Sequence, residues 1–298
     1  MSKKVYFVAC AAARPGLLGV VAHLHEAIEA DVEYSRIYTI NAGHWRHIDL
    51  DFEARSIAYT SPPWSWWILG KRGEVAIVSA NGTTYERIAD AGTGNKKLGY
   101  LNQIRLIDNR IFVCGYRRQI YCREKERWIH FDQGILADKV ERGKGLLGMC
   151  GKTWDNLYVV GRDGEIFHFD GNDWSNLNSP TNLTLEACCT SRTNDIFVCG
   201  NKGLILRGNH QGWMLIDPAG FSENLWDIIE YQGETISAHR SGLVKVRKDK
   251  VEPWEGLPPN TTTARLAVIG DQLWSVGNYH IQMYDGVKWH GFPCPDNT

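Results

Sequence analysis

The sequence lacks a surplus of charge of either sign. Its 33 lysine and arginine residues nearly balance 34 aspartate and glutamate residues, so the formal net charge is −1 and the pI is about 6.8. A general polyanion binder needs a strong excess of positive charge, and this chain has none. Any charged binding surface must therefore be local.

Long hydrophobic runs are also missing. The apolar residues 5–13 are too few to span a bilayer, and Arg14 and Pro15 interrupt them. This segment superficially resembles the apolar part of a signal peptide. We expect it instead to form the first strand of the fold, and we expect no membrane insertion.

The motifs of several enzyme and metal classes are absent. No Cys-x-x-Cys, His-Glu-x-x-His or Gly-x-Ser-x-Gly motif occurs. His23, His25 and Glu26 lack a third ligand at a matching spacing, so we interpret them as part of an acidic surface helix over residues 24–31. The sequence thus predicts no catalytic residues, no metal and no cofactor.

Most cysteines lie inside apolar runs rather than at turns. Such thiols are typical of a reducing compartment, which favours a cytoplasmic protein with reduced, buried cysteines. The eight are Cys10, Cys114, Cys122, Cys150, Cys188, Cys189, Cys199 and Cys294.

What the sequence does contain is a repeat. The 244 residues from the first aromatic to the last divide into six intervals of about 41 residues, close to the length of one propeller blade. In each unit the aromatic follows a turn, and these positions are Trp45, Tyr85, Trp128, Trp174, Trp213, Trp254 and Trp289.

A second feature recurs at the same interval. An apolar strand precedes the first turn of six units, and in five of them it ends in glycine: Gly70, Gly115, Gly161, Gly200 and Gly277, with His239 in the sixth. Glycine at this point indicates either a positive φ or a close approach of two backbones. An apolar inner strand precedes it, starting near Ile57, Ile104 and Ala187 in three of the units, and two strands after it complete a four-stranded unit.

The repeat predicts an all-β fold, a single seven-bladed β-propeller of four-stranded antiparallel blades over residues 1–298. We place the blades at approximately 4–52, 53–92, 98–134, 145–180, 184–220, 223–258 and 263–298. Each unit holds its own four strands, so the ring is expected to close without strand exchange. Residues 145–153 superficially resemble a phosphate-binding loop, but the repeat places a strand there instead of the required helix N-terminus.

The residues 158–174, echoed at 196–213 and 273–289, resemble degenerate Asp-box (BNR-like) repeats of bacterial β-propellers. Photosystem II assembly-factor-type propellers are similar. A full Asp-box has serine two residues before the aspartate, whereas this chain has His168 before Asp170, which argues against a sialidase. The pair Trp226-Asp227 falls in a predicted inner strand, so the chain does not match a standard WD repeat.

Aligning the units brings basic residues together in the turns between the second and third strands. These turns share one face of a propeller, so they predict a basic arc that attracts an acidic partner. The alternative is that they are ordinary solvated turns. The candidate residues are Lys71, Arg72, Arg117, Arg118, Arg162, Lys202 and Arg240, against one acidic residue, Asp163.

Two further candidates are Trp64 and Trp66, which lie beside Pro62 and Pro63. An exposed tryptophan in a loop is typical of an interface anchor. The alternative is that these side chains fill the space between two blades.

The sequence therefore favours a non-catalytic protein-binding propeller. Propellers that resemble this one serve in bacteria as assembly factors and as immunity proteins encoded with secreted toxins. We expect a cytoplasmic immunity or inhibitor protein that binds a toxin with an acidic surface. An assembly factor or chaperone scaffold remains an alternative, as does a carbohydrate-acting enzyme with paired carboxylates in a central pocket. Nucleic acid is a less favoured partner because no aromatics alternate with the basic turn residues.

Overall fold

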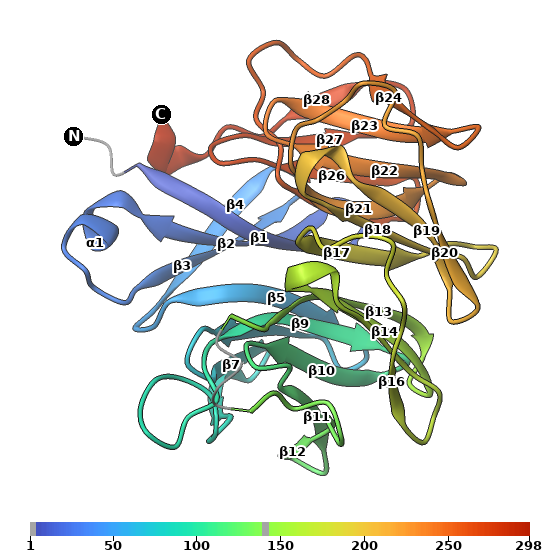
Figure 1. The fold of residues 1–298 in the computed structure, drawn as a ribbon. Helices are drawn as coiled ribbons and strands as arrows, with labels where there is room; N and C mark the ends of the chain where they lie inside the picture. Colours follow the sequence, from blue (N-terminus) through green and yellow to red (C-terminus); the bar gives the residue numbers. More distant parts are fainter. Residues whose placement is uncertain (1–3, 139–142) are drawn as a thin grey trace.

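The computed structural model describes residues 4–138 and 143–298, so residues 1–3 and 139–142 of the predicted domain lie outside it. The described chain is a β-propeller (Figure 1). Seven sheets each contain four strands that are consecutive in sequence and pair antiparallel. The predicted fold class is confirmed.

The strands of the first four blades are β1 (Val5–Arg14), β2 (Leu17–Leu24), β3 (Ser35–Asn41), β4 (His44–Leu50); β5 (Ala54–Thr60), β6 (Ser65–Gly70), β7 (Glu74–Ser79), β8 (Gly82–Arg87); β9 (Leu101–Ile107), β10 (Arg110–Gly115), β11 (Ile120–Glu124), β12 (Arg127–His130); β13 (Leu146–Thr153), β14 (Asn156–Gly161), β15 (Ile166–Phe169) and β16 (Trp174–Asn176). Those of the last three are β17 (Leu185–Thr190), β18 (Ile196–Gly200), β19 (Ile205–Asn209), β20 (Gly212–Leu215); β21 (Leu225–Tyr231), β22 (Glu234–His239), β23 (Gly242–Arg247), β24 (Lys250–Trp254); β25 (Arg265–Ile269), β26 (Gln272–Val276), β27 (Ile281–Tyr284) and β28 (Trp289–Gly291).

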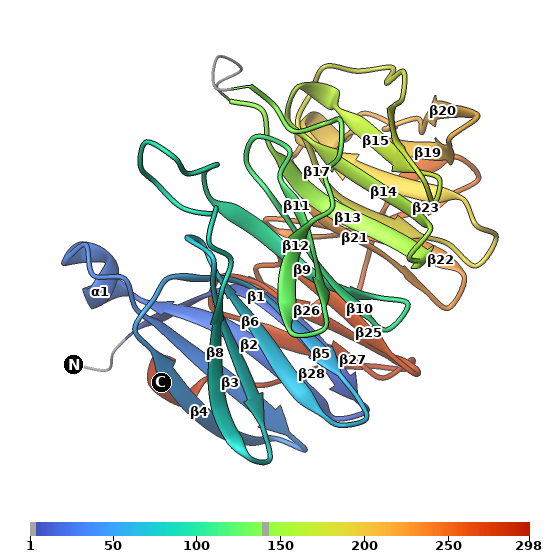
Figure 2. The ribbon, with the colours of Figure 1, turned by 90° about the horizontal axis from the view of Figure 1, so that it is seen from below.

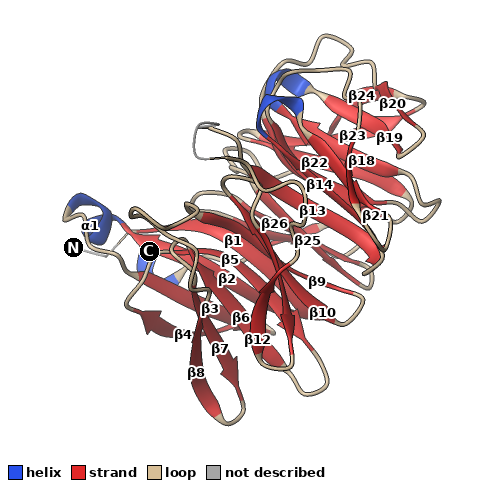
Figure 3. Cartoon of the chain, turned by 60° about the horizontal axis from the view of Figure 1, so that its bottom comes forward, coloured by secondary structure: helices blue, strands red, loops and turns tan. Residues whose placement is uncertain are grey.

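Helix is confined to short pieces (Figure 3). The α-helix α1 (His25–Glu29) lies where the sequence predicts a helical insertion, and none of its residues is buried. Three 3₁₀ turns are η1 (Arg162–Gly164), η2 (Asn201–Gly203) and η3 (Pro295–Asn297). Among the described residues, no helix has the length and apolar character needed to cross a membrane.

The first strand of each blade faces the centre of the ring. Each of these inner strands contacts the inner strand of the next blade, and β25 contacts β1, which closes the ring. In Figure 2, β1 is the innermost strand of the blue first blade and lies beside the red C-terminal blade. No strand is exchanged between the termini, because every sheet is built from consecutive strands.

Side chains and backbone reinforce this closure. The Asn297 amide accepts from Val5 N at 2.8 Å and donates to Val5 O at 3.1 Å. Phe7 N donates to Asn278 O at 3.0 Å. The helix α1 adds a contact across the same junction, where the His25 ring stacks on Tyr279 and lies 2.8 Å from its hydroxyl. The first and last blades are thus joined by several separate contacts.

The hydrophobic core lies between the blades. Seven buried clusters each combine side chains from two neighbouring blades, one for every junction of the ring. Because both faces of a blade are covered, its second strand is buried along almost its whole length, without the alternation of buried and exposed residues of a one-sided sheet. Every residue of β6 and of β18 is buried, for example.

The repeated aromatics all lie in the fourth, outermost strands, as predicted. Two of them link neighbouring blades by hydrogen bonds. Trp174 Nε1 donates to Phe131 O at 2.6 Å, and Trp128 Nε1 donates to the Glu86 carboxylate at 2.9 Å. Tyr85, by contrast, is 61% exposed, so the repeat position does not enforce burial in every blade.

The glycine that ends the second strand is required by close backbone approach. Gly161 has an extended φ of −168°, which any residue can adopt. A Cβ on Gly161 would lie 2.1 Å from Gly145 O, and one on Gly200 would lie 2.3 Å from Thr184 O. The end of the second strand therefore presses directly on the segment that enters its own blade. Of the two reasons considered from the sequence, close approach applies here.

Candidate functional site

The turns between second and third strands lie at the same end of the ring as the connections between blades, and we call this end the turn face. Hydrogen bonds join the two sets: Arg117 N donates to Lys144 O at 2.9 Å and Arg162 N donates to Gly145 O at 3.0 Å. Asn201 N donates to Thr184 O at 3.1 Å in the same manner. These bonds hold the predicted basic turns against the connections that lead into the first strands of the blades.

In the second blade the basic turn is neutralised locally. Lys71 Nζ forms ion pairs with Glu53 and, at 3.0 Å, with Glu33, while Arg72 lies 2.8 Å from the same Glu33 carboxylate. Partial burial disfavours the charge on Lys71, but hydrogen bonds with Glu53 and Glu33 outweigh it and raise its pKa. Lys71 therefore stays charged within a compensated group of carboxylates.

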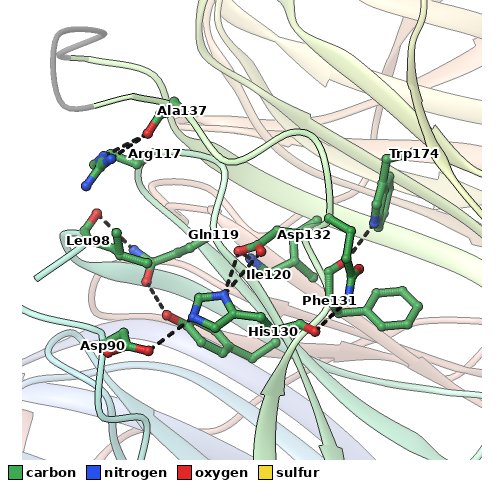
Figure 4. A network of polar contacts seen from close by, with 12 residues as sticks. Asp90, Leu98, Arg117, Gln119, Ile120, His130, Phe131, Asp132, Ala137 and Trp174 are labelled. Carbon is green, nitrogen blue, oxygen red and sulfur yellow. Dashed lines mark hydrogen bonds and ion pairs between the residues drawn. The ribbon is translucent and has the colours of Figure 1, made fainter.

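In the third blade, one arginine binds a carboxylate of the next blade and the other binds a backbone carbonyl. Arg118 forms two hydrogen bonds with the Glu165 carboxylate of the fourth blade, at 3.1 and 2.7 Å. The Arg117 guanidinium donates twice to Ala137 O, at 3.0 and 2.6 Å (Figure 4). Arg118 joins two blades, and Arg117 holds Ala137 within the connection from β12 to β13.

The remaining three basic residues have no carboxylate partner in the described part of the chain. Arg162 donates to the Tyr116 hydroxyl at 2.8 Å, and its guanidinium carbon lies 5.0 Å from the centre of that ring. The side chains of Lys202 and Arg240 form no hydrogen bond or ion pair with any residue that the structure describes. The seven candidates thus share a face but differ in charge compensation, which leaves Arg117, Arg162, Lys202 and Arg240 unpaired by carboxylates there.

The two tryptophan candidates lie in different environments. Trp66 is buried in β6, where its ring packs 4.8 Å from Tyr59 and fills the space above Gly19. Trp64 lies in the turn before β6 and is 43% exposed. That turn connects first and second strands, so it lies at the end of the ring opposite the turn face.

A cavity of about 660 Å³ occupies the centre of the ring. It is bordered by the inner strands together with Tyr116, Arg240 and Asn278 from the turn face. Over the described strands, the pairing between first and second strands shifts by one residue in six of the seven blades. Such a bulge turns a side chain away from the regular pattern. The six bulged residues, all of which border the cavity, are Val8, Arg55, Asn102, Leu147, Glu186 and Trp226.

The residue after the bulge often holds the next inner strand. The Ser56 hydroxyl accepts from Ile104 N at 3.2 Å, and the Gln103 amide oxygen accepts from Met149 N at 2.7 Å. Asp227 accepts from Leu266 N at 2.9 Å. These bonds fix the inner strands relative to one another and so fix the positions of the bulged side chains.

The charged side chains of the cavity fall into two groups. Arg265 donates to Val8 O at 3.1 Å and to Trp226 O at 2.7 Å, and both Asp227 oxygens accept backbone N–H bonds at 2.9 Å. The side chains of Arg265 and Asp227 therefore bind the backbone of the inner strands. Arg105, Arg240 and Glu186 form no side-chain hydrogen bond or ion pair with any described residue, and the buried Nε of Arg105 lacks an acceptor there. Burial raises the pKa of Glu186, although Arg265 and Arg162 act in the opposite direction.

This arrangement gives no support to a carbohydrate-cleaving pair. The two cavity carboxylates are Glu186 and Asp227, and the second is occupied by its backbone bonds. A superficially triad-like cluster also fails on geometry. Glu223 and the Ser241 hydroxyl both lie against Nδ1 of His239, at 3.1 and 3.4 Å. A catalytic triad needs acid and nucleophile at opposite ring nitrogens.

A polar network supports the blade connections on the turn face around the third blade (Figure 4). The fully buried Gln119 amide donates to three carbonyls of the connection before β9, those of Leu98, Gly99 and Tyr100. Nearby, His130 lies 3.1 Å from Asp132 and 3.1 Å from Asp90 through its two nitrogens. The network ties two blade connections to the third blade.

The six bulged residues form what we call the bulged ring. Neither this ring nor the residues that support it were predicted from the sequence. The inner strands were expected to start near Ile57, Ile104 and Ala187, but they begin two to three residues earlier, at Ala54, Leu101 and Leu185. The missed signal is a variable residue between an apolar residue and a small or polar one, as in Leu-Asn-Gln, Leu-Glu-Ala and Leu-Trp-Asp.

No protein-family model matches the chain. A curated protein, Immune protein Tsi7 of Pseudomonas aeruginosa, is 29% identical over 226 residues, which cover 74% of this chain and 73% of that protein. This similarity extends over most of both chains.

Solved structures with the same fold include YCF48 from Cyanidioschyzon merolae, with a TM-score of 0.70, 12% identity and coverage of 100% of this chain and 98% of that one. YCF48 bound to a D1 peptide gives 0.69 and 13%, covering 95% and 92%. The WD40 propeller domain of Doa1 gives 0.69 and 11%, covering 93% and 92%. At these identities the likeness establishes the fold alone.

Proposed function

We propose that this chain is a non-catalytic, protein-binding propeller that acts as an immunity protein, binding a bacterial toxin and neutralising it. The observation that carries the proposal is the 29% identity to Immune protein Tsi7 over about three quarters of both chains. The site adds physical support. The turn face is held by hydrogen bonds between turns and connections, and it carries arginine and lysine side chains without carboxylate partners among the described residues.

These unpaired basic residues suit a partner with an acidic surface. Surface charges of this kind mainly steer the encounter and orient the complex, and each contributes roughly 0.2 to 1 kcal/mol. Lys71, Arg72 and Arg118 contribute less to such attraction because nearby carboxylates already compensate them. We therefore assign partner attraction to Arg117, Arg162, Lys202 and Arg240, with Trp64 as a separate exposed anchor at the opposite end.

We place the protein in the cytoplasm. All eight cysteines are free, and seven of them are buried. Free thiols in such number are typical of a reducing compartment.

The first experiment identifies the partner. A tagged copy expressed in its native cell should retain one protein in a fixed ratio, and that protein should stop bacterial growth when produced alone. Co-production of the propeller should restore growth. A captured protein without toxicity, or growth that is not restored, would overturn the immunity proposal and favour the alternative of an assembly factor.

The second experiment tests the turn face. The variant Lys202→Glu/Arg240→Glu changes two side chains that have no partner among the described residues, so it should fold normally and associate more slowly at low salt. The matched control is Lys125→Glu/Arg127→Glu, which makes the same charge change in the exposed turn between β11 and β12, at the opposite end. Equal effects of both variants would remove the turn face as the binding surface.

A further inference from the structure

The bulged ring combines a constant backbone with variable side chains. Elsewhere in the repeat the same residue type returns, as with the aromatics of the outer strands. At the bulge, six blades present six different residue types to one cavity: Val8, Arg55, Asn102, Leu147, Glu186 and Trp226. Packing alone does not require such variety around a polar space. A repeated bulge that presents unlike side chains to one cavity is typical of a recognition site.

The cavity favours a negatively charged occupant. Four arginines and two carboxylates border it. Arg265 and Asp227 already form hydrogen bonds with the backbone, and Arg55 pairs with Glu53 at 2.6 Å. Among the charged groups without a partner in the described chain, Arg105 and Arg240 outnumber the single carboxyl group of Glu186, and the buried Nε of Arg105 has no acceptor there. A buried donor without an acceptor is uncommon in a native protein and calls for a partner.

The dimensions and walls favour a short peptide segment. A volume of about 660 Å³ lies within the range of roughly 300 to 1,000 Å³ that holds compact ligands. Leu147, Ile57 and Trp226 supply apolar and aromatic surface beside the arginines. An acidic side chain with an apolar neighbour would satisfy both kinds of wall.

We propose that the central cavity receives an acidic side chain, with an apolar neighbour, from a loop of the protein that the propeller binds. Arg105 and Arg240 donate to the carboxylate, and Trp226 packs against the apolar neighbour. A carboxylate that accepts charge-assisted hydrogen bonds from two arginines is held more strongly than one bound by neutral donors. This inference rests on the proposed function, because it names the chemistry by which the partner is recognised.

The test uses the intact propeller labelled with 5-fluorotryptophan and probe peptides. Trp226 is the one tryptophan that borders the cavity among the described residues, and its fluorine resonance is assigned with Trp226→Phe. The probe is acetyl-Gly-Asp-Leu-Gly-amide. Titration should shift the Trp226 resonance to saturation and leave the other tryptophans in place. The asparagine form of the peptide should bind roughly tenfold more weakly or worse, since it loses the charge-assisted bonds.

Two further arms decide the source of the carboxylate and the role of the arginines. Succinate should bind more weakly than the aspartyl peptide; equal or tighter binding would mean a small-molecule site and would overturn the proposed occupant. Arg240→Gln should weaken peptide binding severalfold, and Arg105→Gln/Arg240→Gln should abolish it. If the double variant unfolds, Arg240→Gln alone decides. Lys125→Gln/Arg127→Gln is the control and should bind as the parent does.

The inference and the proposed function fail separately. Absence of any Trp226 shift at 20 mM peptide, or equal shifts with the aspartyl and asparaginyl forms, overturns the cavity proposal even if the propeller neutralises a toxin. A saturable, aspartate-dependent shift supports the cavity proposal, whereas failure to restore growth in the toxicity experiment overturns only the immunity function.

Discussion

Arg265 holds parts of three blades with one side chain. Its guanidinium donates to Val8 O in the first blade and to Trp226 O in the sixth, and its own backbone belongs to the seventh. Both acceptors are bulge carbonyls, which lie outside the regular ladder of their strands. Arg265 therefore compensates for hydrogen bonds that the bulges interrupt.

We predict that Arg265→Met lowers the free energy of unfolding by about 2 to 4 kcal/mol, because two carbonyls lose charge-assisted donors at the ring junction. Urea denaturation followed by circular dichroism measures this. Arg240→Met is the control, since it borders the same cavity without a side-chain partner among the described residues, and its effect should stay within about 0.5 kcal/mol. Equal losses in both variants would show that Arg265 contributes only general packing.

Gly161 is a second residue whose role is structural. A Cβ added there would lie 2.1 Å from Gly145 O. This oxygen is a backbone atom and cannot move aside as the end of a flexible side chain could. We predict that Gly161→Ala lowers the free energy of unfolding by about 2 kcal/mol or more. Gly291→Ala is the control, because its Cβ would lie 3.4 Å from the Gln282 side chain, an ordinary contact. A neutral Gly161→Ala would mean that the two segments separate at little cost.

At the scale of elements, the connection that follows β12 is anchored by ionisable groups. His130 lies between Asp132 and Asp90, and its ring is 4.6 Å from that of Tyr121. Partial burial lowers the pKa of His130, but hydrogen bonds with Asp132 and Asp90 outweigh it, and the net pKa is raised. A raised pKa in the folded state stabilises the fold below the unfolded pKa of about 6.5, and this stabilisation is lost as pH rises through the folded pKa.

We therefore predict that His130→Gln lowers the melting temperature more at pH 5.5 than at pH 9. Thermal unfolding at several pH values, followed by circular dichroism, measures the difference from the parent. His44→Gln is the control, because the exposed His44 side chain forms no hydrogen bond with the described residues, and its effect should not vary in this way. A loss that is constant with pH, or larger at pH 9, would contradict the charged His130 pair.

The elements differ in how far their sequence predicts them. The second and fourth strands were located well, because a continuous apolar run ending in glycine and a turn followed by an aromatic are local signals. The starts of the first strands were missed, because bulges at Arg55, Asn102 and Glu186 place polar residues inside an apolar strand. Those residues define the cavity, so the architecture was predictable and the central site was not.

The candidate basic face shows a related limit. Turn positions predicted that Lys71, Arg118 and Arg240 share one face, since that follows from the repeat. The pairing of Glu33 with Lys71 and of Glu165 with Arg118 was not predictable, because Glu33 follows the α1 insertion and Glu165 belongs to another blade. Ion pairs between blades depend on packing across a junction and have no fixed spacing in the sequence.

At the scale of the whole molecule, stability is distributed over equivalent junctions. Each of the seven buried clusters belongs to two blades, and the inner strands form a closed ring, so no blade has a free face. The junction of the first and seventh blades differs in one respect, because no covalent connection crosses it. It depends on contacts such as those of Asn297 with Val5 and of Asp296 with Arg36.

The labelling rates of the cysteines measure how often separate junctions between blades open. Burial raises the pKa of Cys114 to about 12 and that of Cys122 to about 11. It also raises the pKa values of Cys188 and Cys199. Thiolates are the reactive form, so at pH 8 these cysteines should be labelled only when the protein opens. The denatured protein should titrate as eight free thiols under non-reducing conditions.

We predict that Asp296→Asn/Asn297→Ala weakens the junction between the first and last blades selectively. Cys10 and Cys294, which belong to the cluster at that junction, should be labelled faster than in the parent, while Cys114, Cys122 and Cys199 keep the parent rate. Pulsed alkylation with mass spectrometry measures each rate. Trp174→Phe, which removes the bond to Phe131 O between the third and fourth blades, is the matched variant and should accelerate the labelling of Cys114 and Cys122 instead. Uniform acceleration of all eight thiols by either variant would contradict this prediction and show that the ring opens as a single unit. Opening at one weakened junction alone requires the other six junctions to stay closed.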